Sequence, residues 1–156
     1  MSYVLLYRAM ACPYFYPVAR FETSPWSVPP RLPLGDAFSG ECRAPGNSAQ
    51  PDETRVREIC NFGYGRGRCE QFPPASTADA IRFHVTKDAG ELIEIQYVFE
   101  KDCWPGEHGV LEYVHTSVNA ARMSACATLN TTACATILRR QADAYLESYL
   151  KRRSEA

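Results

Sequence analysis

The sequence predicts an α+β domain, in which an irregular, proline-rich N-terminal half wraps a small antiparallel sheet of three or so strands, covered by a long C-terminal helix or helix pair. Three observations lead to this prediction. Eight of the eleven prolines fall between residues 12 and 51 (positions 13, 17, 25, 29, 30, 33, 45 and 51), apolar and polar residues alternate over 80–115, and helix-forming residues dominate 117–153. Because 156 residues can bury one ordinary core, we expect a single domain over 1–156.

The N-terminal half begins with a short apolar run and then changes character. Residues 3–7, Tyr-Val-Leu-Leu-Tyr, suit a buried strand. The prolines between residues 12 and 51 are too closely spaced for a helix or a central strand. Large apolar side chains such as Phe15, Phe21 and Trp26 nevertheless recur there, and a disordered linker rarely carries so many. We therefore expect an ordered coil, which at this length needs a staple such as a metal site.

A short helix is predicted over residues 51–61. The run Pro51-Asp52-Glu53-Thr54 is typical of a helix start, because proline fits the first turn and acidic groups favour the positive end of the helix dipole. Asn61 and Gly63 are residues that end helices. Cys60 would then lie at the C-terminus of this helix, on the face that also carries Val56 and Ile59.

Residues 80–115 have the alternation of antiparallel strands with one buried face. Two alternating runs, 81–86 and 93–99, flank the turn sequence Asp88-Ala89-Gly90, which predicts a hairpin. Cys103-Trp104-Pro105-Gly106 predicts a second turn, and 110–114 would return as a third strand.

The last region, 117–153, has the spacing of an amphipathic helix. Apolar residues recur at intervals near three and four, and basic residues at 151–153 suit the negative end of the helix dipole. Asn130-Thr131-Thr132 favours caps over helix interiors, so it would divide the region into two helices.

Composition excludes several classes of partner. A net charge of −1 and a pI near 6.3 give no electrostatic basis for binding nucleic acid. No apolar run reaches the length of about 18 residues that spans a bilayer, and the N-terminal apolar run lacks the features of an export signal, so we expect a cytoplasmic protein. Seven cysteines in a reducing cytosol favour metal ligation, whereas in an exported protein they would form disulfides with one left over.

Four of the cysteines form the predicted metal site. Cys12, Cys42, Cys60 and Cys69 lie in or beside the irregular segment 12–74, and Cys60 and Cys69 bracket a loop with glycine at alternate positions. Glycines permit positive φ and close backbone approach, so the loop can point its amides at a compact charged group. The predicted cofactor-binding glycines are Gly63, Gly65 and Gly67.

The cysteine spacing favours an iron–sulfur cluster, with zinc or no metal as the alternatives. Zinc usually takes ligands in pairs from tight knuckles, whereas a [4Fe–4S] cubane accepts single cysteines from separate loops and gains from nearby amides and an apolar shield. Aromatics at positions 14, 15, 62 and 72 would supply that shield. The cysteine context over residues 12–74, including Cys12-Pro13, resembles small bacterial iron–sulfur proteins with dispersed ligands. This resemblance implies the cofactor and carries over no activity.

The remaining cysteines, histidines and arginines have simpler interpretations. Cys126 and Cys134 lie among small residues and are expected in the core, while Cys103 is interpreted as a strand end that could replace one of the four ligands. The histidines at 84, 108 and 115 are scattered and expected at the surface, although His108 could serve a zinc site. Arg66 and Arg68 would offset the negative charge of a thiolate-ligated cluster.

These features predict a small [4Fe–4S] protein for electron transfer or redox sensing, working with a redox partner protein or as a subunit of a larger oxidoreductase complex. The alternative is a zinc-stapled structural or protein-interaction domain. No acid–base constellation, phosphate loop or dinucleotide motif is present, so we expect no catalytic activity of its own.

Overall fold

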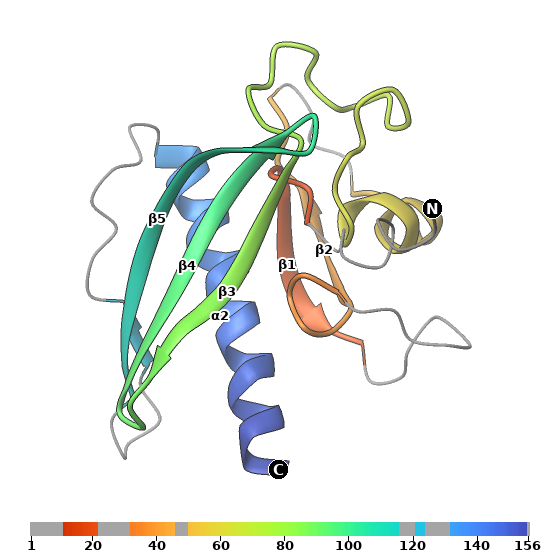
Figure 1. The fold of residues 1–156 in the computed structure, drawn as a ribbon. Helices are drawn as coiled ribbons and strands as arrows, with labels where there is room; N and C mark the ends of the chain where they lie inside the picture. Colours follow the sequence, from red (N-terminus) through yellow and green to blue (C-terminus); the bar gives the residue numbers. More distant parts are fainter. Residues whose placement is uncertain (1–10, 22–31, 46–49, 116–120, 124–131, 156) are drawn as a thin grey trace, which may run out of the picture.

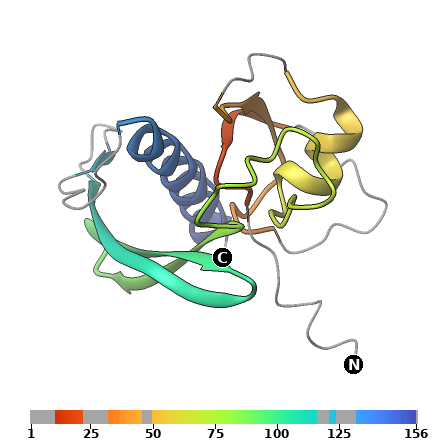
Figure 2. The ribbon, with the colours of Figure 1, turned by 90° about the horizontal axis from the view of Figure 1, so that it is seen from above.

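The α+β prediction is confirmed by the computed structural model, which describes residues 11–21, 32–45, 50–115, 121–123 and 132–155. A two-stranded ribbon and a four-stranded antiparallel sheet lie on either side of a long C-terminal helix, α2 (Thr132–Glu155) (Figures 1 and 2). The predicted strand at 3–7 lies outside the described residues.

The ribbon pairs β1 (Phe15–Arg20) with β2 (Phe38–Cys42), so the expectation that this region is coil without strands is wrong. Its prolines are tolerated because a two-stranded ribbon has edges on both sides, where missing N–H groups cost little. The register shifts between Pro17 and Ala19, which accommodates the proline within β1. Gly40 permits the strands to approach, because a Cβ there would collide with the Tyr16 carbonyl and the Phe15 ring.

The helix predicted over 51–61 is confirmed at both ends, although its second half is a π-helix instead of an α-helix. Asp52 caps α1 (Glu53–Arg55) by accepting the Arg55 N–H at 2.7 Å, and the chain continues as the π-helix η2 (Val56–Cys60). Asn61 then ends the helix. Its side chain accepts the Phe38 N–H at 3.1 Å and donates to the Phe38 carbonyl at 3.0 Å, so it pairs with the backbone of β2 as a neighbouring strand would. This side chain fixes η2 to the start of β2.

The predicted hairpin is confirmed as β3 (Ala80–Asp88) and β4 (Leu92–Lys101), joined by a turn in which the Gly90 N–H donates to Asp88 Oδ1 at 3.0 Å. The third strand is longer than predicted, because β5 (Trp104–His115) pairs along nearly all of β4. The sheet has the order β3-β4-β5-β6, and β6 (Ala121–Met123) corrects the expectation of helix at those positions. Pairing with β5 decides the conformation of this short segment over its helical propensity.

Helix α2 packs one face against the sheet and another against the ribbon. On the sheet side, the Tyr145 ring stacks on Phe83 at 5.7 Å between centroids, and the Tyr113 hydroxyl donates to Asp143 at 3.3 Å. On the ribbon side, the Arg140 guanidinium donates to the Pro17 carbonyl at 2.6 Å. Of the two helices expected over 117–153, the second is observed as α2 from Thr132, while the break expected at 130–132 falls largely outside the described residues.

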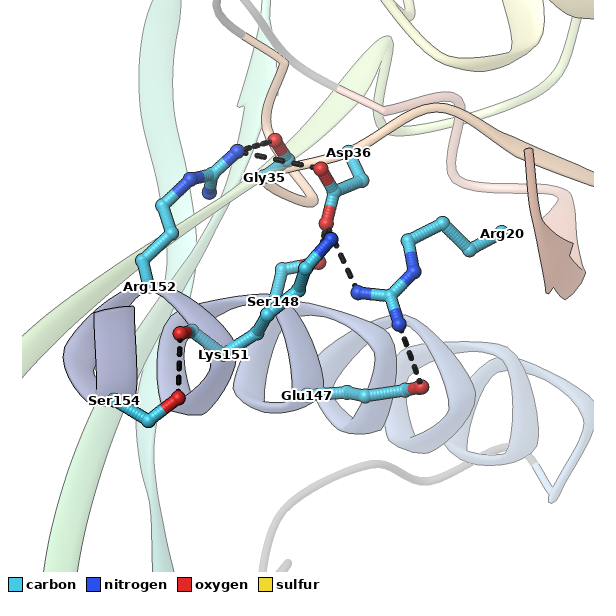
Figure 3. A network of polar contacts seen from close by, with 8 residues as sticks. All are labelled: Arg20, Gly35, Asp36, Glu147, Ser148, Lys151, Arg152 and Ser154. Atoms are coloured by element: carbon cyan, nitrogen blue, oxygen red, sulfur yellow. Dashed lines mark hydrogen bonds and ion pairs between the residues drawn. The ribbon is translucent and has the colours of Figure 1, made fainter. Parts of the chain in front are cut away.

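Asp36 connects α2 to the loop before β2 (Figure 3). The Ser148 hydroxyl donates to Asp36 Oδ2 at 2.6 Å, and Arg20 and Arg152 each approach a carboxylate oxygen at 3.4 Å. Burial alone would raise the pKa of Asp36, but the Ser148 hydrogen bond and the charges of Arg152 and Arg20 outweigh it and lower the pKa below its ordinary value. The carboxylate therefore stabilises the folded chain in its ionised form.

We predict that Asp36→Asn lowers the free energy of unfolding by about 1 kcal/mol at pH 7, a value kept small by solvent screening. Because the folded-state pKa is lowered, this stabilisation is complete above the unfolded pKa of about 3.9 and is lost as the pH falls through the folded pKa. Urea unfolding at pH 7 and at about pH 3 measures both effects, with Glu70→Gln, which removes an exposed carboxylate, as the control. Equal losses in both variants at pH 7 would contradict the role of Asp36.

Candidate metal centre

The four cysteines predicted as ligands line one apolar pocket. Cys12, Cys42, Cys60 and Cys69 all border it, although they come from four separate segments of the chain. Cys12 and Cys60 are buried, whereas Cys42 and Cys69 are half-buried. The pocket also has aromatic walls, formed by the rings of Tyr14, Phe15 and Phe72.

Backbone hydrogen bonds fix Cys12 in place. Its N–H donates to the Cys60 carbonyl at 3.0 Å, which ties the segment before β1 to the end of η2. Ala11, the preceding residue, forms an antiparallel bridge with Ile81 at the start of β3. The Cys12 carbonyl accepts from the Gln141 amide of α2 at 2.8 Å. Cys12 is thus held by η2, by the sheet and by α2 at the same time.

Cys42 comes from the last residue of β2, where it lies opposite Phe15 of β1. The following N–H, of Arg43, donates to the Tyr14 carbonyl at 2.8 Å and extends the ribbon by one more interaction. Strand pairing therefore sets the position of Cys42 relative to Cys12.

Cys69 closes the glycine loop (residues 61–74). The Gly65 carbonyl accepts the Cys69 N–H at 2.7 Å, which folds the loop back on itself. A Cβ at Gly65 would come within 2.9 Å of Ile59 Cγ2 and 3.3 Å of Cys69 Cβ, so glycine is needed for the loop to pack against η2. The Gly63 N–H donates to the Ile59 carbonyl at 2.7 Å, and this amide is therefore used in ending the helix. Gly67, at φ +81°, has open space around it.

Polar side chains anchor the glycine loop to the end of the sheet. Arg66 Nε donates to Asp79 Oδ1 at 2.8 Å, and its other nitrogens donate to the carbonyls of Pro74 and Ser76 at 2.8 and 2.7 Å. The Tyr64 hydroxyl donates to Glu100 Oε1 at 2.9 Å. Arg66 is thus engaged in holding the loop, so the expectation that it offsets the charge of a cluster does not describe its contacts. Arg68 is exposed.

Burial raises the pKa of the Cys12 thiol to about 12, and the nearby thiols of Cys42 and Cys69 add to the effect, partly offset by backbone hydrogen bonds. Burial raises the pKa of Cys60 as well, followed by the influence of the other three thiols, while Arg55 lowers it. The thiols of Cys12 and Cys60 are therefore protonated and neutral at neutral pH in the absence of a bound cation. A bound cation would replace their protons and favour the thiolates.

The pocket is narrow, with a cavity volume of about 20 Å³, which is room for little more than one water-sized sphere. Among the described residues, no group of three or more His, Cys, Asp or Glu side chains is positioned to bind one metal ion. Metal binding at this pocket therefore requires a rearrangement that brings the thiols together around the metal.

The other candidates named from sequence lie elsewhere. Cys103 is exposed in the turn between β4 and β5, outside the pocket lining, and its N–H donates to the Tyr64 hydroxyl at 3.0 Å. His84 and His108 are exposed, as expected. Cys126 and the side chains of Cys134 and His115 lie outside the described residues.

Sequence reasoning missed the residues that position the site. Gln141, Asp79 and Glu100 are buried polar residues, which are uncommon in cores unless they have partners. Their partners are 13 to 129 positions away in the chain, so no local pattern could have identified them. Arg55 lines the pocket five residues before Cys60, and α-helical periodicity would not have indicated that proximity, because residues five apart lie on different faces of an α-helix and it is the wider π-helix that brings them together.

Comparison of the chain with protein-family models, with curated proteins and with solved structures found no match in any of the three. Within the described part of the chain, no helix is both long and apolar enough to cross a lipid bilayer. Functional inference therefore rests on the geometry of the site.

We predict that Arg66→Gln lowers the free energy of unfolding by about 2–3 kcal/mol, because it leaves the buried Asp79 carboxylate without its charged partner. The matched control is Arg68→Gln, the same change two residues away on an exposed side chain, with an expected effect within about 0.5 kcal/mol. Urea unfolding of the two variants and the wild type measures the difference. Similar values for both variants would contradict the anchoring role of Arg66.

Proposed function

We propose that this chain is a small iron–sulfur protein in which Cys12, Cys42, Cys60 and Cys69 bind one [4Fe–4S] cluster, for electron transfer or redox sensing in the cytoplasm. One observation carries the proposal. Four cysteines that span residues 12–69, each from a different segment, line a single pocket. The four are also all but one of the cysteines whose side chains are described.

The cluster is favoured over other metals by the way the ligands are delivered. A cubane has irons at four separate corners, so it can take one thiolate from each of four segments. Structural zinc requires all four sulfurs at about 2.3 Å from one point and usually takes them in pairs from tight knuckles. The apolar, aromatic lining from Tyr14, Phe15 and Phe72 also suits a cluster, because exclusion of water tunes its potential and protects it.

The simpler interpretation, that these are small core residues, explains less. Free cysteine packs well as a small hydrophobe, and Cys12 and Cys60 belong to the hydrophobic core. Cys42 and Cys69 are half-buried, yet they line the same pocket as the two buried thiols. Packing alone gives no reason for partly exposed thiols to gather there, whereas ligation does.

A set of four cysteine ligands favours electron transfer over catalysis at the cluster. Four thiolates occupy one site on each of the four irons, which leaves no iron open for substrate. Because Cys42 and Cys69 are the less buried pair, their side of the cluster would be nearest to solvent. A redox partner or the rest of a larger oxidoreductase complex would dock on that side, since electron transfer becomes faster as the distance shortens.

Zinc is the second candidate, and the size of the cavity favours it. A space of about 20 Å³ is closer in size to a single ion than to a cubane, which would need the pocket to open further. In that case the metal would stabilise the fold, by on the order of 10 kcal/mol for structural zinc. The chain would then serve as a structural or protein-interaction domain.

The deciding experiment is anaerobic purification followed by analysis of iron, acid-labile sulfide and zinc. The proposal predicts brown protein with about four iron and four sulfide per chain, directly or after anaerobic reconstitution. One zinc per chain with no iron would support the second candidate. Protein that binds neither metal would overturn both.

We predict that Cys60→Ala and Cys69→Ala each abolish metal binding, because these residues bracket the three glycines at positions 63, 65 and 67. Cys12→Ala and Cys42→Ala should abolish binding as well or leave a labile, partly occupied site, since a cubane can persist with three thiolates. Metal stoichiometry under anaerobic conditions measures each variant. The controls are Cys103→Ala, which changes an exposed thiol outside the pocket, and Cys126→Ala and Cys134→Ala. Loss of metal in the controls with retention in Cys60→Ala would show that the site has been placed wrongly.

A further inference from the structure

A second and much larger cavity, of about 620 Å³, lies beside the cysteine pocket. Its walls come from the residues flanking Cys12, the chain after β2, the segment 76–78, the end of β4, the start of β5, and α2. A volume of this size falls within the range of sites that bind small molecules, about 300–1,000 Å³. The two cavities share one wall residue, Tyr14.

The lining combines apolar surface with a few charged groups. Aromatic and aliphatic surface comes from Tyr14 just before β1, Phe99 of β4 and Ile137 of α2. The charged residues of the lining are two basic ones, Arg43 and Lys101, and one acidic one, Glu107. Sites that bind small molecules typically have this composition, in which apolar walls supply affinity and a few charges fix orientation.

The two basic side chains differ in how they are held. The Arg43 guanidinium stacks on the Tyr16 ring at 3.5 Å from the centroid and pairs with Glu41 at 3.2 Å. An arginine carries five N–H donors, so one carboxylate does not exhaust it, and its orientation is already fixed. Lys101, the last residue of β4, is exposed, and its charge helps to lower the pKa of Asp79, although among the described residues it makes no ion pair within 4.0 Å. Lys101 is therefore the cation most able to pair with a ligand.

We propose that this cavity binds a small organic anion with a flat apolar body, such as an aromatic carboxylate. The apolar body lies against Tyr14, Phe99 and Ile137, and the anionic group lies toward Lys101. Glu107 opposes the anion by like-charge repulsion and so limits its affinity. The inference does not rest on the proposed metal, because the cavity is lined by its own residues apart from Tyr14.

The test is calorimetric titration of the full chain with 2-naphthoate and with 2-naphthalenemethanol, which has the same rings and no charge. We expect one saturable site for the carboxylate and about tenfold weaker binding of the alcohol, since the charge-assisted interaction is lost. Lys101→Gln should weaken binding of 2-naphthoate about tenfold, and Glu107→Gln should strengthen it about threefold. Lys87→Gln, the same change at an exposed residue of β3 outside the cavity, should leave the affinity unchanged.

The opposite signs of the Lys101 and Glu107 variants are the distinctive result, because nonspecific apolar binding would change neither. Three outcomes would overturn the inference: no saturable binding of 2-naphthoate, equal affinity for the alcohol, or equal shifts in Lys101→Gln and Lys87→Gln. Thermal unfolding of each variant shows whether the fold is kept, and metal analysis of the same samples tests the cysteine site separately.

Discussion

The buried amide of Gln141 is the contact on which the arrangement depends. Its Nε2 donates to the carbonyls of Cys12 and Phe15, at 2.8 and 2.7 Å, from a side chain that is fully buried. Hydrogen bonds in such a low-dielectric interior are strong, and losing one leaves a costly unpaired group. This single side chain joins the C-terminal helix to the first cysteine of the site, 129 positions earlier in the chain. Cys12 therefore depends on α2 for its position as well as on η2 and on the sheet.

The cysteine pocket is continuous with the hydrophobic core. Cys12 and Cys60 pack in the same cluster as Phe15 and Phe38 of the ribbon and the apolar residues of the sheet. Binding at the pocket would therefore be coupled to folding of the whole chain, because the ligands are core residues that the fold brings together. A metal bound there would add its binding free energy to the free energy of unfolding.

The sequence patterns predict those elements of the fold that are set by interactions between residues close in sequence. The β3–β4 hairpin and the start of the helix near Asp52 depend on residues close in sequence, and both are predicted from the sequence. The β1–β2 ribbon was missed because Asn61 and Gly40 make it possible through contacts across the fold, while proline content argued against strands. Of the candidate site, the four thiols were chosen from their sequence context, and the structure brings them to one pocket. The residues that support them form pairs distant in sequence, which periodicity cannot detect.

The short segment from Cys12 to Tyr14 serves both cavities, and its contacts explain how. The Cys12 side chain faces the smaller pocket, while Pro13 lines the larger one and Tyr14 borders both. The Tyr14 ring lies edge-on to Phe72 at 5.6 Å, and its carbonyl accepts the Arg43 N–H at 2.8 Å. The tyrosine is thus fixed by the glycine loop on one side and by the ribbon on the other. Because Tyr14 lines both cavities, a ligand in the larger cavity that contacts Tyr14 would touch a residue that also borders the cysteine pocket.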